Sequence, residues 1–233
     1  MPYGDPLRSR LTRERVLEKV RWEVLQATAP VARRFARNRG RTFPFRGKQY
    51  EYFVHSHNLT WRNERAVELP IALRFLEDST GRILEFGNVL GRYGANVARV
   101  ILDKYERGPG VINQDIVDYF PENGFDRIVS VSTLEHVGWD ESPQEPQKVF
   151  LAWDRLRGLL NPQGSMLITV PLGQNPLLDE AIYEHSFDVT RASVMVRSGD
   201  DWLESTDFRV QPQRPRWALG PDRVWIAEVL NGE

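Results

Sequence analysis

The stretch RILEFGNVLGRYG, residues Arg82 to Gly94, decides the fold that we expect for this chain. Its apolar run from Ile83 to Phe86 has the length of a short buried strand, and Gly87 ends the run. Further glycines follow at Gly91 and Gly94. A strand that ends in a glycine-bearing turn lets a ligand approach bare backbone, which side chains would block. The stretch therefore predicts a strand followed by a ligand-binding turn.

An acidic residue, Glu85, lies inside this strand, two residues before Gly87. A carboxylate is out of place in a purely structural core strand, and here it can accept hydrogen bonds from an amine or from N–H groups. One alternative is a dinucleotide-binding fold, whose fingerprint is G-x-G-x-x-G. The glycines do not have that spacing, and that fold does not explain the acid. A strand and turn without any ligand is the other alternative.

Two strand patterns downstream also end in polar residues. Residues 100–102 are apolar and lead into Asp103, eighteen positions after Glu85. A carboxylate at the end of the second strand can hold a ribose diol, and both rival folds predict it. Residues 110–112 form a weaker pattern, which leads to Asp115 and Ile116. On local grounds Asp115 is equally well a helix cap.

The clearest strand is FDRIVSV, residues 125–131, which runs into the segment STLEHV. The segment 143–160 has a helical pattern, and 161–164 reads as a turn into a strand at 165–170. We also expect helices at 63–77 and 93–99, a loop over the site at 184–188 and a closing edge strand at 223–230. Strands alternating with helices predict a Rossmann-like α/β fold, with a mostly parallel sheet and helices on both faces. Its ligands bind at the carboxyl ends of the strands.

Four signals in this order resemble the class I S-adenosylmethionine-dependent methyltransferase family. They are ILEFG, LDKY, DRIVSVSTLEHV and LLNPQGSMLITVP, and the resemblance covers roughly residues 63–230. The chain departs from the family pattern at Val89, where the family usually has its middle glycine. The helix expected after the turn is also short, and the third strand is weak.

The resemblance implies in-line methyl transfer from the sulfonium donor S-adenosylmethionine. The protein then supplies alignment, exclusion of water and, for a hydroxyl acceptor, a general base. It also implies that Glu85 and the backbone near Gly87 hold the amino-acid part of the donor. Asp103 would hold the ribose, Asp115 the adenine amino group and Ile116 the ring. The cofactor-binding residues implied in all are Glu85, Gly87, Asn88, Val89, Gly91, Asp103, Lys104, Asp115, Ile116, Ser132, Thr133 and Leu134.

His136 is the first candidate for the general base, because it follows the fourth strand and a histidine titrates near neutrality. His57 and His185 are the alternative bases. His136 could equally be a packing or hydrogen-bonding residue. Glu135 is either its orienting partner or a simple exposed acid, since neighbouring positions rarely face each other.

Residues 42–65, TFPFRGKQYEYFVHSHNLTWRNER, are crowded with aromatic side chains and hold two of the four histidines. In a strand, alternation would point His55 and His57 to one face. We interpret the segment as covering the substrate or cofactor. The alternative is a surface loop that packs its aromatics on the body. No carboxylate pair completes a His-x-His metal set, so no metal is predicted. The candidate substrate residues, two of whose arginines can pair with a carboxylate or phosphate, are His55, Asn58, Trp61, Arg62, Arg65 and His185.

Composition limits the location and the partners of the chain. Its 233 residues carry a net charge of −1, and the absence of cysteine excludes disulfides and a cysteine nucleophile. No apolar run approaches the roughly 20 residues that span a bilayer, and no signal-peptide core is present. We therefore expect a soluble, cytoplasmic protein. Residues 1–48 are nevertheless basic, with thirteen Lys and Arg against four Asp and Glu. Either an anionic partner or the acidic body of the chain could meet this charge.

The expected organisation is an N-terminal helical and aromatic extension, residues 1–62, followed by a methyltransferase-like domain, residues 63–233. The extension begins with a loose arm at 1–9, and an amphipathic helix at 11–29 has Thr12 as its cap candidate. We expect methylation of a small polar acceptor, for example O-methylation of a sugar or another hydroxylated metabolite. The alternatives are a protein or nucleic-acid acceptor, or a methyltransferase-like binding protein without catalysis. The sequence leaves the oligomeric state open, and a homodimer is compatible with it.

Overall fold

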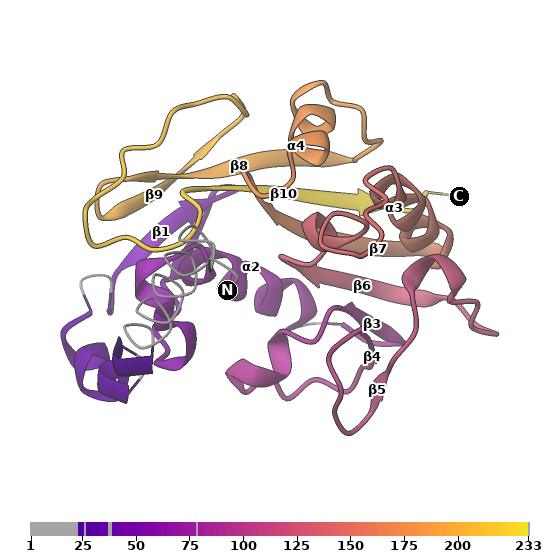
Figure 1. Ribbon diagram of the computed structural model, residues 1–233, viewed down its shortest axis with the longest axis horizontal. Coiled ribbons are helices and arrows are strands. Elements are labelled where there is room, and N and C mark those ends of the chain that lie inside the picture. Colours follow the sequence, from indigo (N-terminus) through magenta and orange to yellow (C-terminus); the bar gives the residue numbers. More distant parts are fainter. Residues whose placement is uncertain (1–22, 26, 37–38, 78, 233) are drawn as a thin grey trace, which may run out of the picture.

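A single eight-stranded sheet forms the centre of the molecule (Figure 1). The computed structural model describes residues 23–25, 27–36, 39–77 and 79–232. The strand order is β5-β4-β3-β6-β7-β10-β8-β9. The strands from β5 to β7 are parallel, β10 is antiparallel to both of its neighbours, and β9 is antiparallel to β8. The bounds are β3 Ile83–Phe86, β4 Val100–Leu102, β5 Val111–Ile112, β6 Phe125–Val131, β7 Leu160–Pro171, β8 Arg191–Ser198, β9 Asp201–Ser205 and β10 Arg223–Leu230.

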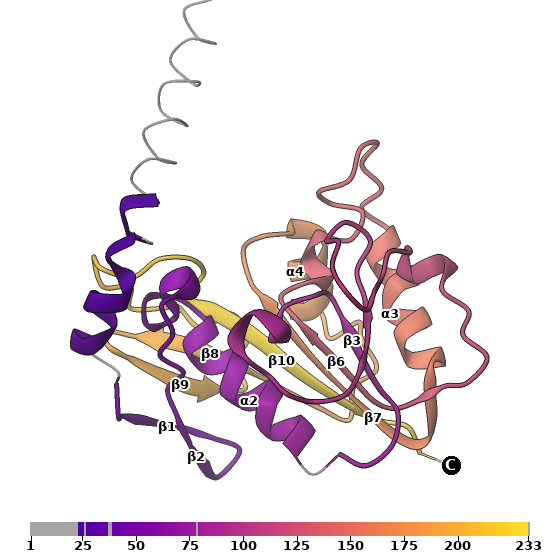
Figure 2. The ribbon, with the colours of Figure 1, turned by 90° about the horizontal axis from the view of Figure 1, so that it is seen from below.

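Helices cover both faces of the sheet (Figures 1 and 2). Helix α2, Arg65–Glu77, shares an apolar core with one face. Helices α3, Lys148–Gly158, and α4, Pro176–Tyr183, share the core on the other face. All four residues of β3 are buried, as expected for a parallel strand covered on both sides. The predicted Rossmann-like α/β fold is therefore confirmed.

A small hairpin, β1 Thr42–Phe45 and β2 Lys48–Glu51, packs on the same core as α2. Residues 23–25 and 27–32 are helical and 33–35 form a 3₁₀ turn. The arm expected at 1–9 and the cap Thr12 lie outside the described residues, as does most of the helix expected at 11–29. The division at residue 62 stays a prediction.

The expected helix at 93–99 was wrong. A short 3₁₀ turn, η3, spans Leu90–Tyr93 and ends at Gly94, whose φ is +79°. Residues 95–99 then lack regular structure up to β4. The cause is Arg99, whose guanidinium donates to the carbonyls of Ala95 and Val97 and forms an ion pair with Glu85. The buried ion pair between Arg99 and Glu85 is thus formed in place of a helical turn.

Two strand expectations also need correction. The segment 223–230 is β10, which lies between β7 and β8 and is not an edge strand, because β8 and β9 fold back outside it. The turn expected at 161–164 belongs to β7. Gln163 and Gly164 pair through their backbone with Asn231, which extends the strand at its amino end. Helix α3 begins at Lys148, later than the expected start at 143.

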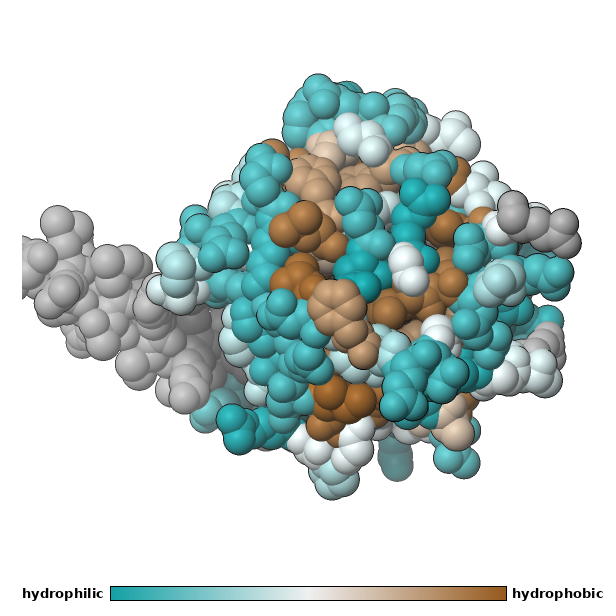
Figure 3. All heavy atoms as spheres, turned by 90° about the vertical axis from the view of Figure 1, so that its right-hand side faces the viewer, coloured by the Kyte–Doolittle hydropathy of each residue, from teal (hydrophilic) through white to brown (hydrophobic). Residues whose placement is uncertain are grey.

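The surface is mixed in polarity. On the side of the molecule at the right of Figure 1, apolar residues gather near the centre and hydrophilic residues surround them (Figure 3). Among the helices that the structure describes, none has the length and apolar character needed to cross a membrane.

Candidate functional site: a pocket at the carboxyl ends of the parallel strands

A pocket of about 490 Å³ opens where the parallel strands β3, β4 and β6 end and the chain after β5 returns. This is the edge at which α/β sheets bind ligands. Eight of the predicted cofactor residues line it: Asn88, Val89, Asp103, Lys104, Asp115, Ile116, Ser132 and Thr133. The rest of the lining is Arg65, Phe86, Tyr105, Glu106, His136, Val137, Asp140 and Glu141. Four predicted cofactor residues do not line it: Glu85, Gly87, Gly91 and Leu134.

Glu85 binds the turn after β3 through hydrogen bonds and does not line the pocket. It is 1% exposed. One carboxylate oxygen accepts hydrogen bonds from the backbone N–H groups of Val89 and Leu90, at 2.8 and 2.7 Å. The other oxygen pairs with Arg99. The acid inside the strand thus binds N–H groups of its own turn, and its direct contact with a donor amine is not supported by this arrangement.

Gly87 lets the turn after β3 pack against the segment after β6. Its φ is +91°, and a Cβ at this position would lie 2.1 Å from Oγ1 of Thr133. Gly91 has no such requirement, because the nearest atom to a Cβ there is 3.5 Å away. Val89, which replaces the glycine of the family pattern, has an ordinary φ of −101°. Of these positions only Gly87 is constrained by both backbone and packing.

Asp103 joins the turns after β3 and β4. Its carboxylate accepts from the backbone N–H groups of Asn88, Tyr105 and Glu106, at 3.1, 2.9 and 2.7 Å. A carboxylate has about four lone-pair sites, so acceptor capacity is left on the pocket side. Asp103 is therefore fixed in position and still able to accept from a ligand.

A square of four charges borders the pocket after β5. Asp115 and Glu141 each pair with both Lys104 and Lys148, at distances from 2.5 to 2.8 Å. Burial raises the pKa of Asp115, but the hydrogen bonds from the two lysines outweigh it, so its pKa is lowered. Asp115 also caps the 3₁₀ turn η4, Ile116–Asp118, by accepting from the N–H of Val117 at 3.2 Å. Asp115 therefore lines the pocket and also caps a helical turn, so the two expectations for this residue are compatible.

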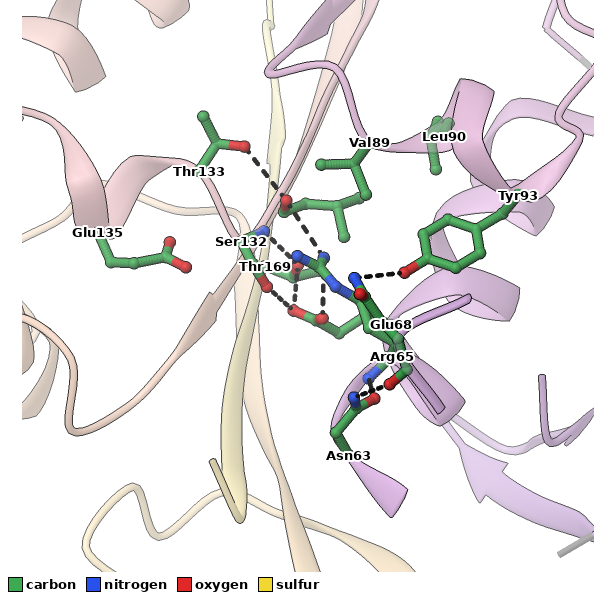
Figure 4. A network of polar contacts seen from close by, with 12 residues as sticks. Asn63, Arg65, Glu68, Val89, Leu90, Tyr93, Ser132, Thr133, Glu135 and Thr169 are labelled. Atoms are coloured by element: carbon green, nitrogen blue, oxygen red, sulfur yellow. Dashed lines mark hydrogen bonds and ion pairs between the residues drawn. The ribbon is translucent and has the colours of Figure 1, made fainter. Parts of the chain in front are cut away.

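A buried network fastens α2 to the ends of β6 and β7 (Figure 4). Glu68, with no exposed surface, accepts from the hydroxyls of Ser132 and Thr169, both at 2.7 Å. Its other oxygen lies 3.3 Å from Nη1 of Arg65. Ser132 has a φ of +44°, which is rare for a residue other than glycine and is held here by the network. The network places the Arg65 guanidinium at the pocket wall.

In the buried layer behind the pocket, Arg65 is a single cation near three acidic side chains, Glu64, Glu68 and Glu135. Glu64 and Glu135 each have one buried oxygen without a hydrogen-bond partner. Burial raises the pKa of Glu64 to about 7 and that of Glu135 well above its usual range. Burial lowers the pKa of Arg65, but the carboxylates of Glu68 and Glu64 outweigh it, so the pKa is raised. Arg65 therefore stays a cation beside two carboxyl groups, Glu64 and Glu135, whose pKa values are raised by burial.

His136 is the histidine that lines the pocket, and its side chain is 55% exposed. Its Nδ1 lies 2.6 Å from a carboxylate oxygen of Asp140, and its Nε2 lies 3.6 Å from Glu135. The closer partner is Asp140, which the sequence analysis missed although its i, i+4 spacing from His136 was visible. Glu135 is buried, so its description as an exposed acid was wrong.

His55 and His57 lie against the ring of Tyr93, at centroid distances of 5.5 and 5.4 Å. Neither lines the pocket. They are not in a strand: His57 begins the 3₁₀ segment η2, His57–Arg62, and its N–H donates to Nδ1 of His55. Burial lowers the pKa of both. His185 is exposed, and its ring lies 4.9 Å from that of Phe208 at a tilt of 41°; it also lies outside the pocket lining.

Of the other predicted substrate residues, only Arg65 lines the pocket. Asn58 donates to the hydroxyl of Tyr93 at 3.2 Å. Trp61 is buried in a small cluster with Ala29, and Arg62 donates to the carbonyl of Trp217 at 2.7 Å. The aromatic segment thus packs mostly on the body, as the alternative interpretation expected.

Several residues of the site come from outside the predicted set. Glu68 lies on the inner face of α2 and Thr169 at the end of β7, while Lys148 opens α3 and Glu141 follows His136 in a loop. No local sequence signal brings these residues together. Within the described ranges, no three His, Asp or Glu side chains are grouped as ligands of a metal ion.

No protein-family model matches this chain, and no curated protein matches it. Among solved structures, the chain is similar to the N-methyltransferase NodS from Bradyrhizobium japonicum WM9 in complex with S-adenosyl-L-homocysteine. The identity is 15% over 71% of this chain and 86% of that chain, with a TM-score of 0.47. It is also similar to the 1,6-didemethyltoxoflavin-N1-methyltransferase from Burkholderia thailandensis, at 14% identity over 72% and 79% of the two chains and a TM-score of 0.45.

A third similar structure is an rRNA methylase from Streptococcus thermophilus. It is 11% identical over 70% of this chain and 96% of that chain, with a TM-score of 0.43. At such identities and scores the similarity concerns the chain trace. What the site can do chemically follows from the side chains of this molecule.

Proposed function

We propose that this protein is an S-adenosylmethionine-dependent methyltransferase that binds its donor in the pocket at the carboxyl ends of β3, β4 and β6. The observation that carries the proposal is the convergence of the ends of β4, β5 and β6 on one pocket beside the turn after β3, each of these three with a suitable group. Asp103 follows β4, Asp115 and Ile116 follow β5, and Ser132 follows β6. A nucleoside needs acceptors for its ribose hydroxyls and an apolar contact for its base, and this set provides both.

The sheet itself argues against the dinucleotide alternative. The classic dinucleotide fold joins two βαβαβ halves in the order 3-2-1-4-5-6. Here the antiparallel β10 is inserted between β7 and β8, which interrupts the second half. The glycine spacing also differs from G-x-G-x-x-G. A dinucleotide needs two nucleoside-binding halves of the sheet. This sheet has one such half and one that is interrupted by β10, which fits a single adenosine group better.

The residues present fit such a donor. Gly87 lacks the Cβ that would push the turn away from Thr133, so the turn stays close to the end of β6. Asp103 keeps free acceptor capacity for a ribose diol, and Ile116 offers an apolar face. Arg65, held by Glu68, supplies a fixed cation for the donor carboxylate. When bound, S-adenosylmethionine supplies a methyl group activated by its positive sulfur.

We assign His136 as the general base for a hydroxyl acceptor. Asp140 accepts a hydrogen bond from Nδ1–H, so Nε2, which lies 3.6 Å from a carboxyl oxygen of Glu135, is the nitrogen that takes the proton of the acceptor. The half-exposed position at the pocket mouth suits an acceptor that enters from solvent. His57, the alternative base, is turned toward Tyr93, and the geometry favours it less.

For the acceptor we propose a small polar molecule such as a sugar or another hydroxylated metabolite, and we place the protein in the cytoplasm. Support comes from the polar rim of the pocket, where His136 and Asp140 offer hydrogen bonds to hydroxyl groups. A nucleic-acid or protein acceptor is the second candidate, favoured by the basic composition of residues 1–48. Binding to nucleic acid would weaken steeply with salt, whereas binding of a neutral sugar would not.

Calorimetric titration tests the donor site directly. We expect micromolar binding of S-adenosylmethionine and of its demethylated product, and no binding of NAD. Asp103→Asn should weaken binding by about tenfold or more, the effect of losing a charge-assisted hydrogen bond. Asp118→Asn is the matched control, because Asp118 is exposed and lies outside the pocket lining. Binding of NAD alone, or of none of the three, would refute the proposal.

A further inference from the structure

A second cavity of about 220 Å³ lies between the β1–β2 hairpin, α2 and the sheet. It shares no lining residue with the pocket described above. Its apolar lining comes from Phe45, Ile71, Phe75 and Leu167, and Tyr50 lines it as well. Four cationic side chains and one carboxylate complete it: Arg46, Lys48, Arg74, Arg191 and Glu228. At ~30 Å³ for each water, the cavity holds roughly seven waters, enough for a phosphate group with part of a small organic molecule.

Two arginines of this cavity share one carboxylate oxygen. Oε2 of Glu228 lies 2.6 Å from Nη1 of Arg46, and 3.0 and 2.7 Å from Nε and Nη2 of Arg191. One negative charge thus holds two guanidinium groups together. Burial lowers the pKa of Arg46, and the nearby Arg191 lowers it further, against the opposite effect of Glu228 and Glu204. The pair is prearranged for an additional anion.

The hairpin holds Arg46 in an unfavourable backbone conformation. Arg46 and Gly47 are the two loop residues between β1 and β2, with φ values of +48° and +72°. Such two-residue turns prefer Asn, Asp or Gly at the first position, because an ordinary side chain is strained there. The turn places the guanidinium against Glu228, with 15% of the side chain exposed. Backbone positions held in such sparsely populated conformations cluster at ligand-binding sites.

Two more donors of the cavity have no partner among the described residues. The Lys48 ammonium forms no ion pair or hydrogen bond there, and the Tyr50 hydroxyl forms no hydrogen bond. Arg46, Arg74 and Arg191 line the same cavity as Tyr50. Arg74 pairs with Glu77 on its exposed side. Guanidinium, ammonium and phenol donors around one space match an anion with several acceptor oxygens.

We propose that this second cavity binds the phosphate group of a small phosphomonoester. Arg46 and Arg191 contact the phosphate as a pair, Lys48 adds a third cation, and Phe45, Tyr50 and Phe75 contact the organic part. A phosphate monoester offers three acceptor oxygens and nearly two negative charges at neutral pH, whereas a carboxylate offers two oxygens and one charge. The cluster therefore favours phosphate over carboxylate ligands. This site is independent of the donor pocket and of the proposed methyl transfer.

The test uses phenyl phosphate, inorganic phosphate and benzoate, titrated calorimetrically at one fixed ionic strength. We expect saturable binding of phenyl phosphate, weaker binding of inorganic phosphate, and benzoate weaker than phenyl phosphate by about tenfold or more. The double variant Lys48→Gln, Arg191→Gln should lose at least about tenfold in affinity for phenyl phosphate. Its matched control is Arg209→Gln, because Arg209 is as exposed as Arg191 (59% against 57%) and pairs with an acid elsewhere.

Three results would overturn the proposal. One is the absence of saturable phenyl phosphate binding up to about 10 mM. Another is equal affinity in the double variant and the wild type, and the last is benzoate binding as tightly as phenyl phosphate. Circular dichroism checks that the double variant folds, and both of its positions are exposed. If that variant does not fold, Lys48→Gln alone, which removes no observed pair, takes its place with the same criterion.

Discussion

The turn after β3 allows a sharp test, because its three glycines differ in what the structure requires of them. Gly87 has a φ of +91°, and a Cβ added to it would lie 2.1 Å from Oγ1 of Thr133. Gly94 has a φ of +79° and no atom within 4 Å of a Cβ. Gly91 has neither constraint, with its nearest atom at 3.5 Å. Alanine substitution at each position therefore separates backbone strain from packing.

The expected losses of unfolding free energy follow from these geometries. Gly94→Ala should cost about 1–2 kcal/mol, the strain of a left-handed backbone with a Cβ. Gly87→Ala adds the overpacking against Thr133, about 1–3 kcal/mol, for a total of about 2–5 kcal/mol. Gly91→Ala should be close to neutral, or stabilising by a few tenths of a kcal/mol to about 1 kcal/mol, because alanine restricts the unfolded chain. A stability of about 10 kcal/mol, the middle of the usual range, leaves all three variants folded.

Urea unfolding followed by circular dichroism measures these losses, with Thr133→Ala as the second mutation of a cycle. That change removes the two nearest atoms, Oγ1 and Cγ2 at 2.1 and 2.9 Å, and leaves the Thr133 Cβ at 3.0 Å. In this background Gly87→Ala should cost clearly less, closer to the value for Gly94→Ala. Equal costs of Gly87→Ala with and without the Thr133 side chain would refute the packing argument. A cost for Gly91→Ala as large as that for Gly87→Ala would refute the distinction between the glycines.

Three further outcomes follow from the buried groups and the histidine. Glu68→Ala removes a fully buried carboxylate from its ion pair with Arg65 and leaves two hydroxyls without their acceptor, so we expect a loss of about 3–5 kcal/mol in urea unfolding. A loss below about 1 kcal/mol would contradict the network. The pKa of Glu64 is raised to about 7 in the folded protein, so the folded state binds this proton more tightly than the unfolded state. The wild type should therefore lose stability relative to Glu64→Gln as the pH rises from about 4.5 to 7, and parallel stability profiles of the two proteins would contradict this. His136→Asn should lower kcat by about 10²-fold or more and leave donor binding unchanged, whereas Asp140→Asn should shift the pH profile of kcat. Unchanged turnover in His136→Asn would exclude His136 as the base.

The strands could be predicted because burial on both faces leaves a short run that is mostly apolar. Residues 83–86 and 125–131 are the examples, and each was expected within a residue of its observed bounds. Asp103 and Asp115 could be placed at the site for a topological reason: parallel strands end at one edge of the sheet. These predictions needed only the local pattern and the order of the elements.

The errors arose where a distant side chain decided the local structure. The helix expected at 93–99 is absent because Arg99 reaches Glu85 instead of extending a helical turn. The position of β10 depends on β8 and β9, which fold back outside it, and no pattern within β10 itself reports that. Glu68 lies in the helix expected at 63–77, and no pattern within that helix indicates that it has no exposed surface.

Glu68 and Glu85 together explain how the pocket keeps its shape with few glycines. Each is a buried carboxylate behind the pocket, and each holds one wall: Glu85 the turn after β3, and Glu68 the segment after β6. Both are neutralised by an arginine, Arg99 for Glu85 and Arg65 for Glu68. Arg99 is buried with its partner, whereas Arg65 also lines the pocket. A ligand carboxylate at Arg65 would therefore bind to a cation whose position is set by the same network that sets Ser132. Binding and the strained backbone at the end of β6 would be coupled through Glu68, since any movement of Arg65 disturbs the acceptor of the Ser132 hydroxyl.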